Sequence, residues 1–354
     1  RTPAATTTGV RIAGCGAALP ERRVTNEDLV AFMDTSDAWI VERSGIRERR
    51  WAGPDESTRT LAVAAARAAL DDGGVTASQV DVVLVATTTP HMPLPSTASQ
   101  VVADIGANAG AADLNAACAG FVYGSVVAAG LLATGAARTV LLVGADTMTR
   151  AIDVTDRSTA VLFADGAGAM VLTAGGTTAP PRPSPVPPGP TPGLVACDLV
   201  NDPAGVDLLV IPAGGSARPA SADTVAAGEH HLRMEGREVF RRAVRAVEAS
   251  IGRTLDQAGC GPDDVTLFVP HQANARIVDA VLARTGLDPA RTSSTIERYG
   301  NTSAASIPVA LAESSRDGTV RDGDLVLMCG FGAGLTVGTA LWRWGSTATA
   351  DVPS

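Results

Sequence analysis

The sequence predicts an α/β fold made of two duplicated halves, which pack into five alternating layers, α-β-α-β-α. Two continuous apolar runs, Asp81–Ala86 and Thr139–Gly144, have the composition of strands buried on both faces of a parallel sheet. Ala-rich helical segments alternate with such runs, which indicates parallel strands joined by crossover helices. A helix, a short turn, an acidic residue and an apolar strand occur in this order twice, in Arg67–Val85 and in Arg253–Val269.

The first half begins with a predicted strand over residues 9–14. Thr25 supplies the N-cap of a helix that runs to about Met33, and Asp34–Asp37 caps a second helix over residues 38–43. These short elements precede the main alternation of helices and strands.

The rest of the first half contains the clearest sequence patterns for helices and strands. Thr58–Leu70 predicts a long Ala-rich helix. Each half is then predicted to close on a glycine turn between two strands. The first turn lies in Gly166–Leu172, between two strand-like segments of residues 160–173, and the second lies in Gly332–Val337. Residues 213–229 are polar and small, which predicts a loop.

We divide the chain into an N-terminal half over residues 9–178, a linker over 179–193 and a C-terminal half over 194–345. The linker is dense in proline, which predicts an extended surface loop with little helix or sheet. A tolerated insertion explains this segment better than a Pro-rich recognition motif does.

Composition excludes several classes of function. The net charge is −9 and basic residues form no blocks, which argues against nucleic acid as the main partner. No apolar run reaches about 18 residues, so no membrane span is predicted, and residues 1–8 lack the apolar core of a signal peptide. The five cysteines are scattered and never form C-x-x-C, so neither disulfides nor a metal site is expected. Reduced thiols in a cytoplasmic protein fit best.

Cys118 stands in a run of very small residues. Ala112–Leu114 predicts a strand before it and Phe121–Leu132 a helix after it, which puts the thiol near the first turn of that helix. Unpaired backbone N–H groups and the positive end of the helix dipole gather there, so a thiol ionises more easily and becomes a nucleophile. A buried, inert cysteine is the alternative, and this stretch alone leaves both open.

The duplication gives Cys118 a counterpart in the second half. Tyr299–Ile307 is again a turn before a small-residue helix, and Asn301 is expected to hold the position that Cys118 holds in the first half. An Asn alone would be interpreted as a helix cap. His271 follows the predicted strand 267–270, at the end where α/β folds place ligands. Chemistry on thioesters needs a nucleophile and neutral donors for an enolate oxygen, and Cys, His and Asn supply both.

Four motifs resemble the β-ketoacyl-acyl-carrier-protein synthase III family of thiolase-fold condensing enzymes. They are Asp34–Arg50, AACAGF around Cys118, VPHQANARI around His271 and YGNTSAAS around Asn301, and the closing Gly330–Gly334 is also similar. The resemblance covers residues 9 to 344 in order. It implies a thiolase-like five-layer fold.

The resemblance also implies a reaction. Cys118 would take an acyl group from acyl-CoA, which is a substrate, so no cofactor is expected. His271 and Asn301 would donate hydrogen bonds to the thioester carbonyl of a malonyl-acyl carrier protein as it loses CO2, and the carbanion would attack the acyl-Cys. The N–H groups of Cys118 and Ala333 would form the oxyanion hole. The β-ketoacyl product would start fatty acid or polyketide synthesis, and a homodimer is implied.

Positions at the CoA tunnel also match. Trp39 and Arg157 resemble a pair that sandwiches adenine, since an indole and a planar guanidinium both stack on a base. Arg43 and Asn274 match other positions at the tunnel. Without the family, Trp39 would be interpreted as core and Arg157 as a surface charge.

Further positions concern the partners. Arg241, Arg276 and Arg284 would form a basic patch for an acidic carrier protein, although Arg241 and Arg284 fit solvated helix charges equally well. Leu94 replaces an aromatic residue that reaches the partner's acyl pocket in relatives, so a longer or branched acyl group is expected. Arg237 stands where a smaller Asn is expected.

Two other functions fit the same sequence. An acyltransferase of this fold would form acyl-Cys and pass the acyl group to an alcohol or an amine, and Asn301 would then be dispensable. A non-catalytic partner in a synthase heterodimer should have lost its nucleophile, whereas Cys118 is present.

Overall fold

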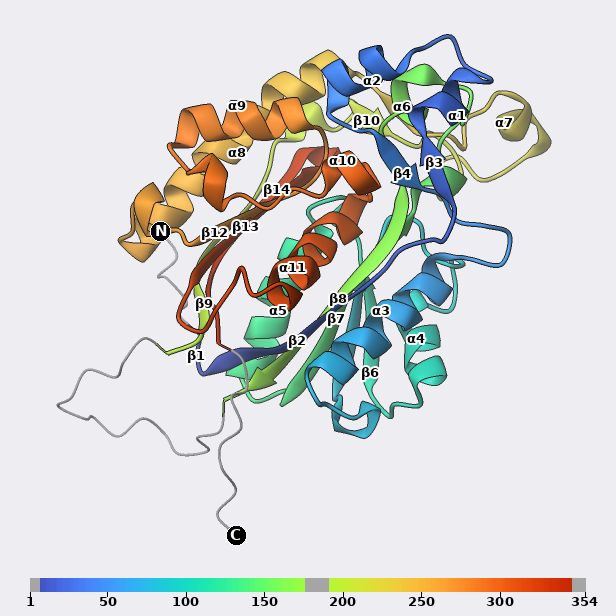
Figure 1. The fold of residues 1–354 in the computed structure, drawn as a ribbon. Coiled ribbons are helices and arrows are strands. Elements are labelled where there is room, and N and C mark those ends of the chain that lie inside the picture. Colours follow the sequence, from blue (N-terminus) through green and yellow to red (C-terminus); the bar gives the residue numbers. More distant parts are fainter. Residues whose placement is uncertain (1–6, 176–190, 346–354) are drawn as a thin grey trace, which may run out of the picture.

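The computed structural model describes residues 7–175 and 191–345, which fold around two mixed β-sheets (Figure 1). The strand order is β2-β8-β7-β5-β6 in the first sheet and β1-β9-β14-β13-β12 in the second. The strands are β1 (Thr7–Thr8), β2 (Val10–Ala18), β3 (Arg23–Thr25), β4 (Glu48–Arg50), β5 (Val82–Ala86), β6 (Gly110–Leu114), β7 (Thr139–Thr147), β8 (Asp165–Ala174), β9 (Gly193–Asn201), β10 (Leu209–Val210), β11 (Arg233–Met234), β12 (Leu267–Pro270), β13 (Leu325–Gly332) and β14 (Thr336–Arg343).

Helices cover and separate the two sheets. They are α1 (Asn26–Val30), α2 (Asp37–Ser44), α3 (Thr58–Asp72), α4 (Thr97–Ile105), α5 (Gly120–Ala133), α6 (Arg157–Ala160), α7 (Ala222–Ala226), α8 (Gly236–Ala258), α9 (Ala275–Thr285), α10 (Ile296–Tyr299) and α11 (Ser306–Arg316). No helix in the two described ranges has the length and apolar composition that a membrane span needs.

The two sheets repeat one topology, which confirms the predicted α/β fold. In the first, β2 pairs antiparallel with β8, β8 antiparallel with β7, and β7 parallel with β5. In the second, β9, β14, β13 and β12 pair in the same way. Where β6 extends the first sheet, the second has a single parallel bridge between Phe268 and Thr292.

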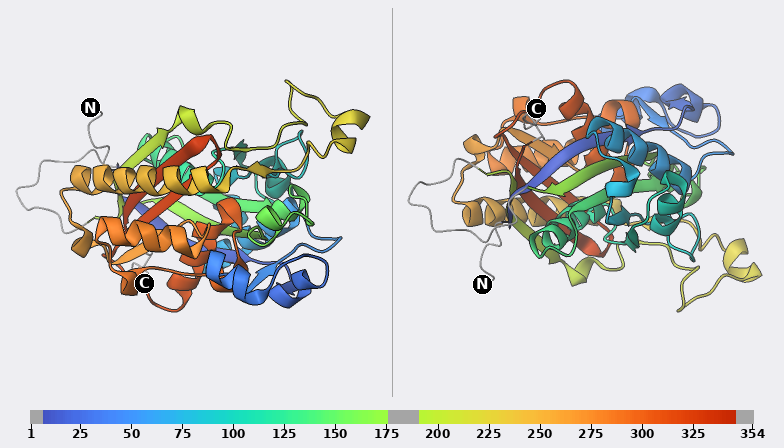
Figure 2. Two further views of the ribbon diagram at one scale, coloured as in Figure 1. Left: turned by 90° about the horizontal axis from the view of Figure 1, so that it is seen from above. Right: turned by 90° about the horizontal axis from the view of Figure 1, so that it is seen from below.

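The five layers are visible in Figure 1. Helices α3 and α4 cover the outer face of the first sheet, α5 and α11 lie between the sheets, and α8 and α9 cover the second sheet. Seen from above, α8 and α9 lie side by side, and the segment with α7 projects from the body (Figure 2). Residues 213–229, predicted to be a loop, therefore include this one short helix.

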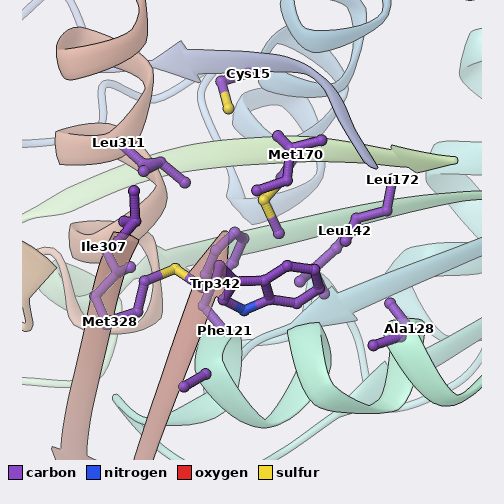
Figure 3. Close-up of a cluster of buried hydrophobic side chains, with 14 of the residues drawn as sticks. Cys15, Phe121, Ala128, Leu142, Met170, Leu172, Ile307, Leu311, Met328 and Trp342 are labelled. Carbon is purple, nitrogen blue, oxygen red and sulfur yellow. The ribbon is translucent and has the colours of Figure 1, made fainter. Parts of the chain in front are cut away.

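The central layer buries the largest apolar cluster. Phe121 of α5 and Ile307 of α11 meet Met170 and Leu142 of the first sheet and Trp342 of the second (Figure 3). Each of these side chains is at most 1% exposed. Because α5 and α11 pack on both sheets, the residues just before them lie at the boundary between the two halves.

Small residues let the outer helix α3 approach its sheet. Ala65 and Ala69 are fully buried, and a Cβ on Gly14 or Gly16 of β2 would overlap the backbone of these alanines. Close approach of backbones therefore fills the core of a chain that has few large aromatic side chains.

The prediction of a glycine turn in Gly166–Leu172 is wrong. Residues 157–160 form α6, and β8 runs without a break through the glycines. Gly168 is required for packing, because a Cβ there would lie 2.7 Å from the backbone carbonyl carbon of Pro308 in α11. The equivalent prediction in the second half is confirmed, since a 3-10 turn at Ala333–Leu335 joins β13 to β14.

The predicted linker over residues 179–193 falls mostly on 176–190, which lie outside the described residues. At its end, Gly193 already begins β9. The boundaries of the two halves stay a prediction.

We expect Gly168→Ala to lower the free energy of unfolding by about 1–3 kcal/mol, the usual cost of overpacking a filled core. Gly252 is the matched control, because it lies in α8 and a Cβ added to it would have no neighbour within 4 Å, and alanine there should gain about 0.4–1 kcal/mol. Thermal unfolding of both variants checks this. Equal stability of the two variants would contradict the packing role of Gly168.

Candidate active site

The two central helices, α5 and α11, are entered through the same turn. In the first half the side-chain oxygen of Asn115 accepts the N–H of Ala117 at 3.2 Å, and Ala117 has a φ of 49°. In the second half Asn301 accepts the N–H of Ser303 at 2.9 Å, and Ser303 has a φ of 53°. Left-handed residues other than glycine are costly and cluster at functional sites.

This match sets the register between the halves. Gly144 and Gly330 are both the sixth residue of their strands, β7 and β13. A Cβ on Gly144 would overlap the carbonyl oxygen of Ala304, whereas one on Gly330 would lie 3.3 Å from the carbonyl oxygen of Cys118. Cys118 and Ala304 are therefore equivalent.

The expectation that Asn301 takes the position of Cys118 is accordingly wrong by three residues. Asn301 is equivalent to Asn115, and both cap their turns. The sequence does carry a marker for the register, because Asn115 stands three residues before Cys118 and Asn301 three residues before Ala304. Asn301 and Cys118 still lie together, because the turns meet at one boundary between the halves.

Cys118 precedes α5 and is 8% exposed. Its Sγ lies 3.3 Å from Oγ of Ser303. Burial raises the pKa of the Cys118 thiol to about 12, and the negative charge of Asp146 acts in the same direction. The expectation of an easily ionised thiol is therefore wrong, because desolvation outweighs the roughly 0.3–1 kcal/mol that a helix N-terminus contributes.

The backbone N–H of Cys118 is open. It makes no hydrogen bond to another of the described residues, although it lies against β13. A Cβ on Gly332 would be 2.5 Å from the Cys118 nitrogen, so no side chain fits there. Ala333 follows Gly332 and lines a cavity together with Cys118. The two residues predicted for the oxyanion hole are thus neighbours.

His271 follows β12 and is 3% exposed. Its Nδ1 lies 2.6 Å from Oγ of Ser306, and the same Oγ accepts the backbone N–H of Gln272 at 3.3 Å. We infer that Ser306 donates its proton to Nδ1, so that Nε2 carries the hydrogen. Burial lowers the pKa of His271 to about 3, so the ring is neutral at pH 7.

Cys118, His271 and Asn301 line one cavity of about 160 Å³. The oxygen of the Asn301 side chain is occupied by its own turn, so its amide NH2 is the group left to donate. The rings of His271 and Phe331 pack edge to face, with their centroids 5.4 Å apart. The cavity thus holds a thiol and two neutral donors.

A second, larger cavity of about 380 Å³ meets the first at Cys118. Ser303 and Ala333 lie beside the thiol, and apolar side chains of the segment 206–211 form much of the wall. Sequence reasoning missed both Ser303 and this segment. Ser303 lies inside the YGNTSAAS motif, which was the available signal, whereas nothing in residues 206–211 marks a cavity wall.

Of the four residues predicted for CoA, one lines the first cavity and a second contacts that residue. Asn274 lines the cavity and donates its side-chain N–H to the carbonyl oxygen of Arg43 at 2.9 Å. Trp39 and Arg157 contact each other, with the guanidinium carbon 4.8 Å from the ring centroid. A base between them would need roughly 7 Å, two van der Waals contacts, so in this structure the pair is closed.

The three arginines predicted for carrier docking differ in their pairing. Arg241 forms an ion pair with Glu238 at 2.5 Å, and Arg284 one with Glu248 at 2.7 Å. The side chain of Arg276 has no ion pair within the described residues. The positive charge of Arg276 is therefore not neutralised by a carboxylate of the described chain, whereas the charges of Arg241 and Arg284 are each paired with one.

Leu94 lies in the loop between β5 and α4 and is 84% exposed. It lines neither of the two cavities. Within one chain the structure therefore does not bring Leu94 to the thiol. Nor do three or more His, Cys, Asp or Glu side chains gather as a metal site in the described part of the chain.

We expect iodoacetamide to alkylate Cys118 slowly at pH 7, because the raised pKa leaves little thiolate. The rate should rise with pH without a plateau below about pH 9. Intact mass and peptide mapping follow the modification, and Cys118→Ala controls for the other four cysteines. A plateau near pH 7 would contradict the effect of burial.

Comparison with known proteins identifies relatives of this chain by sequence and by structure. Family models of 3-oxoacyl-(acyl-carrier-protein) synthase III match residues 112–181, and residues 255–344 for its C-terminal part. The β-ketoacyl-(acyl-carrier-protein) synthase III of Roseiflexus sp. strain RS-1 is 47% identical over 332 residues, 94% of this chain and 97% of that protein.

Two solved structures extend the comparison. The synthase III from Pseudomonas aeruginosa PAO1 is 42% identical with a TM-score of 0.84, covering 96% of this chain and 100% of that chain. The priming β-ketosynthase of the R1128 polyketide pathway is 37% identical with a TM-score of 0.84, covering 97% and 98%. The chain therefore belongs to the β-ketoacyl-acyl-carrier-protein synthase III family of thiolase-fold condensing enzymes.

Proposed function

We propose that the chain condenses an acyl-CoA with a malonyl-acyl carrier protein, giving the β-ketoacyl product that starts fatty acid or polyketide synthesis. Membership of the family supports an acyltransferase of this type. One observation carries the proposal: a buried thiol, a neutral His and an Asn amide line one cavity, and the N–H of the thiol residue is open.

In the first half-reaction, the sulfur of Cys118 attacks the carbonyl carbon of the acyl-CoA thioester. The N–H groups of Cys118 and Ala333 stabilise the oxyanion that forms. Coenzyme A leaves as its thiolate and takes up the proton that the Cys118 thiol loses. Because burial holds the thiol protonated, the proton departs during attack and not before it.

In the second half-reaction, His271 Nε2–H and the Asn301 amide donate hydrogen bonds to the thioester carbonyl of the malonyl group. These bonds strengthen as CO2 leaves and negative charge moves onto that oxygen. The enolate carbon attacks the acyl carbon on Cys118, and the Cys118 sulfur leaves as a thiolate that takes a proton from solvent. Donation by a neutral ring suits a His whose pKa burial has lowered to about 3.

The two cavities suit two parts of the substrates. The 380 Å³ cavity, with its apolar wall, would take the acyl chain. The 160 Å³ cavity would take the thioester arm, with Asn274 and Arg43 at its edge. Adenine binding would need Trp39 and Arg157 to separate, and Arg276 would contribute most to carrier docking.

We further propose a homodimer in the cytoplasm. Leu94 is an apolar side chain that is 84% exposed in one chain, and a second copy would cover it. Its partner's cavity would then be closed by Leu94, a smaller residue than the aromatic one of relatives. All five cysteines are unpaired, which fits a reducing compartment.

We expect acyl-CoA to add one acyl group to the enzyme by intact mass, and malonyl-acyl carrier protein then to release CO2 and restore the mass. Cys118→Ala should not acylate. Asn301→Ala should acylate but lose condensation by about 10²–10³-fold, the usual effect of removing one preorganised donor.

Three outcomes would contradict this scheme. Acylation of Cys118→Ala would exclude Cys118 as the nucleophile. Acylation without CO2 release, with Asn301→Ala unimpaired, would favour transfer to an alcohol or an amine. No acylation by any donor in a panel of chain lengths would favour a non-catalytic partner.

We expect Leu94→Phe to slow acylation by long or branched acyl-CoAs more than acylation by acetyl-CoA, because a partner's ring would shorten the cavity. Val225→Phe is the control, since Val225 is 66% exposed on α7. Acylation rates over a chain-length series check this, together with the solution mass. An unchanged preference, or a monomeric wild-type enzyme, would exclude this role of Leu94.

A further inference from the structure

Asp146 is a fully buried carboxylate in β7 with no ion-pair partner among the described residues. One oxygen accepts five hydrogen bonds, from the side chains of Thr87, Thr88 and Thr89 and the backbone N–H groups of Thr88 and Thr89, at 2.8–3.0 Å. The other oxygen accepts the N–H of Ala304 at 3.1 Å. Neutral donors alone hold this buried charge.

The register between the halves gives this contact a meaning. Asp146 is the eighth residue of β7, and Gly332 is the eighth residue of β13. Asp146 binds the N–H of Ala304, whereas Gly332 leaves the equivalent N–H, that of Cys118, without a partner among the described residues. One position in the duplicated strand therefore fixes one turn and opens the other.

The turn that Asp146 fixes is the one that carries Asn301. Ala304 follows Ser303, which has a left-handed φ, and the N–H of Ser303 is bound to the Asn301 oxygen at 2.9 Å. That bond leaves the Asn301 amide NH2 as the donor. A shift of Ala304 would move Ser303 and rotate the Asn301 amide in turn.

We propose that Asp146 is a positioning residue for the second half-reaction: by holding the Ala304 N–H it fixes the turn that aims the Asn301 amide at the malonyl thioester. This rests on the proposed function. Asp146 lines neither of the two cavities, so we expect it to touch neither substrate. Gly332, the equivalent residue of β13, instead leaves the Cys118 N–H without a partner in the described chain, so that this N–H can stabilise the oxyanion of the first half-reaction.

Asp146→Asn tests this with the two half-reactions measured apart. An amide has one acceptor oxygen, so it cannot hold both the threonine segment and Ala304. We expect condensation to fall roughly 10- to 100-fold, the effect of a displacement of about 1 Å. Cys118 acylation, which does not use the Asn301 amide, should change much less.

A second readout separates positioning from general damage. The charge of Asp146 raises the pKa of the Cys118 thiol, so Asp146→Asn should lower that pKa and speed alkylation of free Cys118 at pH 8. His271, the other titratable side chain that lines either cavity, is neutral in this range and adds no charge.

Asp165→Asn is the matched control. Asp165 is also fully buried, and it accepts the N–H groups of Ala52 and Thr149 and the Thr149 hydroxyl. Its side chain makes no hydrogen bond to the turn of Asn301, although the neighbouring Ala164 donates its N–H to the Asn301 carbonyl oxygen at 2.9 Å. We expect both half-reactions and the alkylation profile to stay near those of the wild-type enzyme.

Equal losses in both half-reactions of Asp146→Asn, or the same split in Asp165→Asn, would overturn the inference. If Asp146→Asn does not fold, Thr87→Val removes one donor to Asp146 and should give the same split at smaller size; equal losses there would also overturn it. Absence of CO2 release by the wild-type enzyme is a different result, which refutes the proposed function itself.

Discussion

The site depends on one constraint, the close approach of β13 to the turn before α5. Gly332 lies so near the Cys118 nitrogen that only hydrogen fits in place of a side chain. This approach keeps the Cys118 N–H free of partners in the described chain while burying it beside Ala333. In the other half, Asp146 fills the equivalent position and uses the equivalent N–H. Duplication thus supplies two copies of one turn, and a single strand position gives them different tasks.

Burial keeps the reacting groups uncharged. It raises the pKa of the Cys118 thiol and lowers that of His271. In the free enzyme, therefore, neither side chain is charged. Charge then appears only as bonds change, on the acyl oxygen and on the enolate oxygen. Preorganised neutral donors stabilise such developing charge without the cost of solvating a permanent one.

The alternation of apolar and Ala-rich segments in the sequence predicted the fold well, because continuous apolar strands and Ala-rich helices are local signals that occur twice in the chain. The motif residues Cys118, His271 and Asn301 were also found, and the structure brings them to one cavity. What failed depends on contacts between distant segments. The glycines of β8 form no turn and instead leave space for α11. The register between the turns before α5 and α11 follows from the contacts of Gly144 and Gly330. The thiol pKa depends on burial, which no local stretch reports.

The most direct test is the structure of the enzyme acylated on Cys118, trapped in Asn301→Ala so that condensation cannot follow. We expect the acyl carbonyl oxygen within about 3 Å of the backbone nitrogens of Cys118 and Ala333, with the chain in the cavity walled by residues 206–211. An acyl oxygen directed to His271 instead, with the Cys118 N–H left unpaired, would contradict the account.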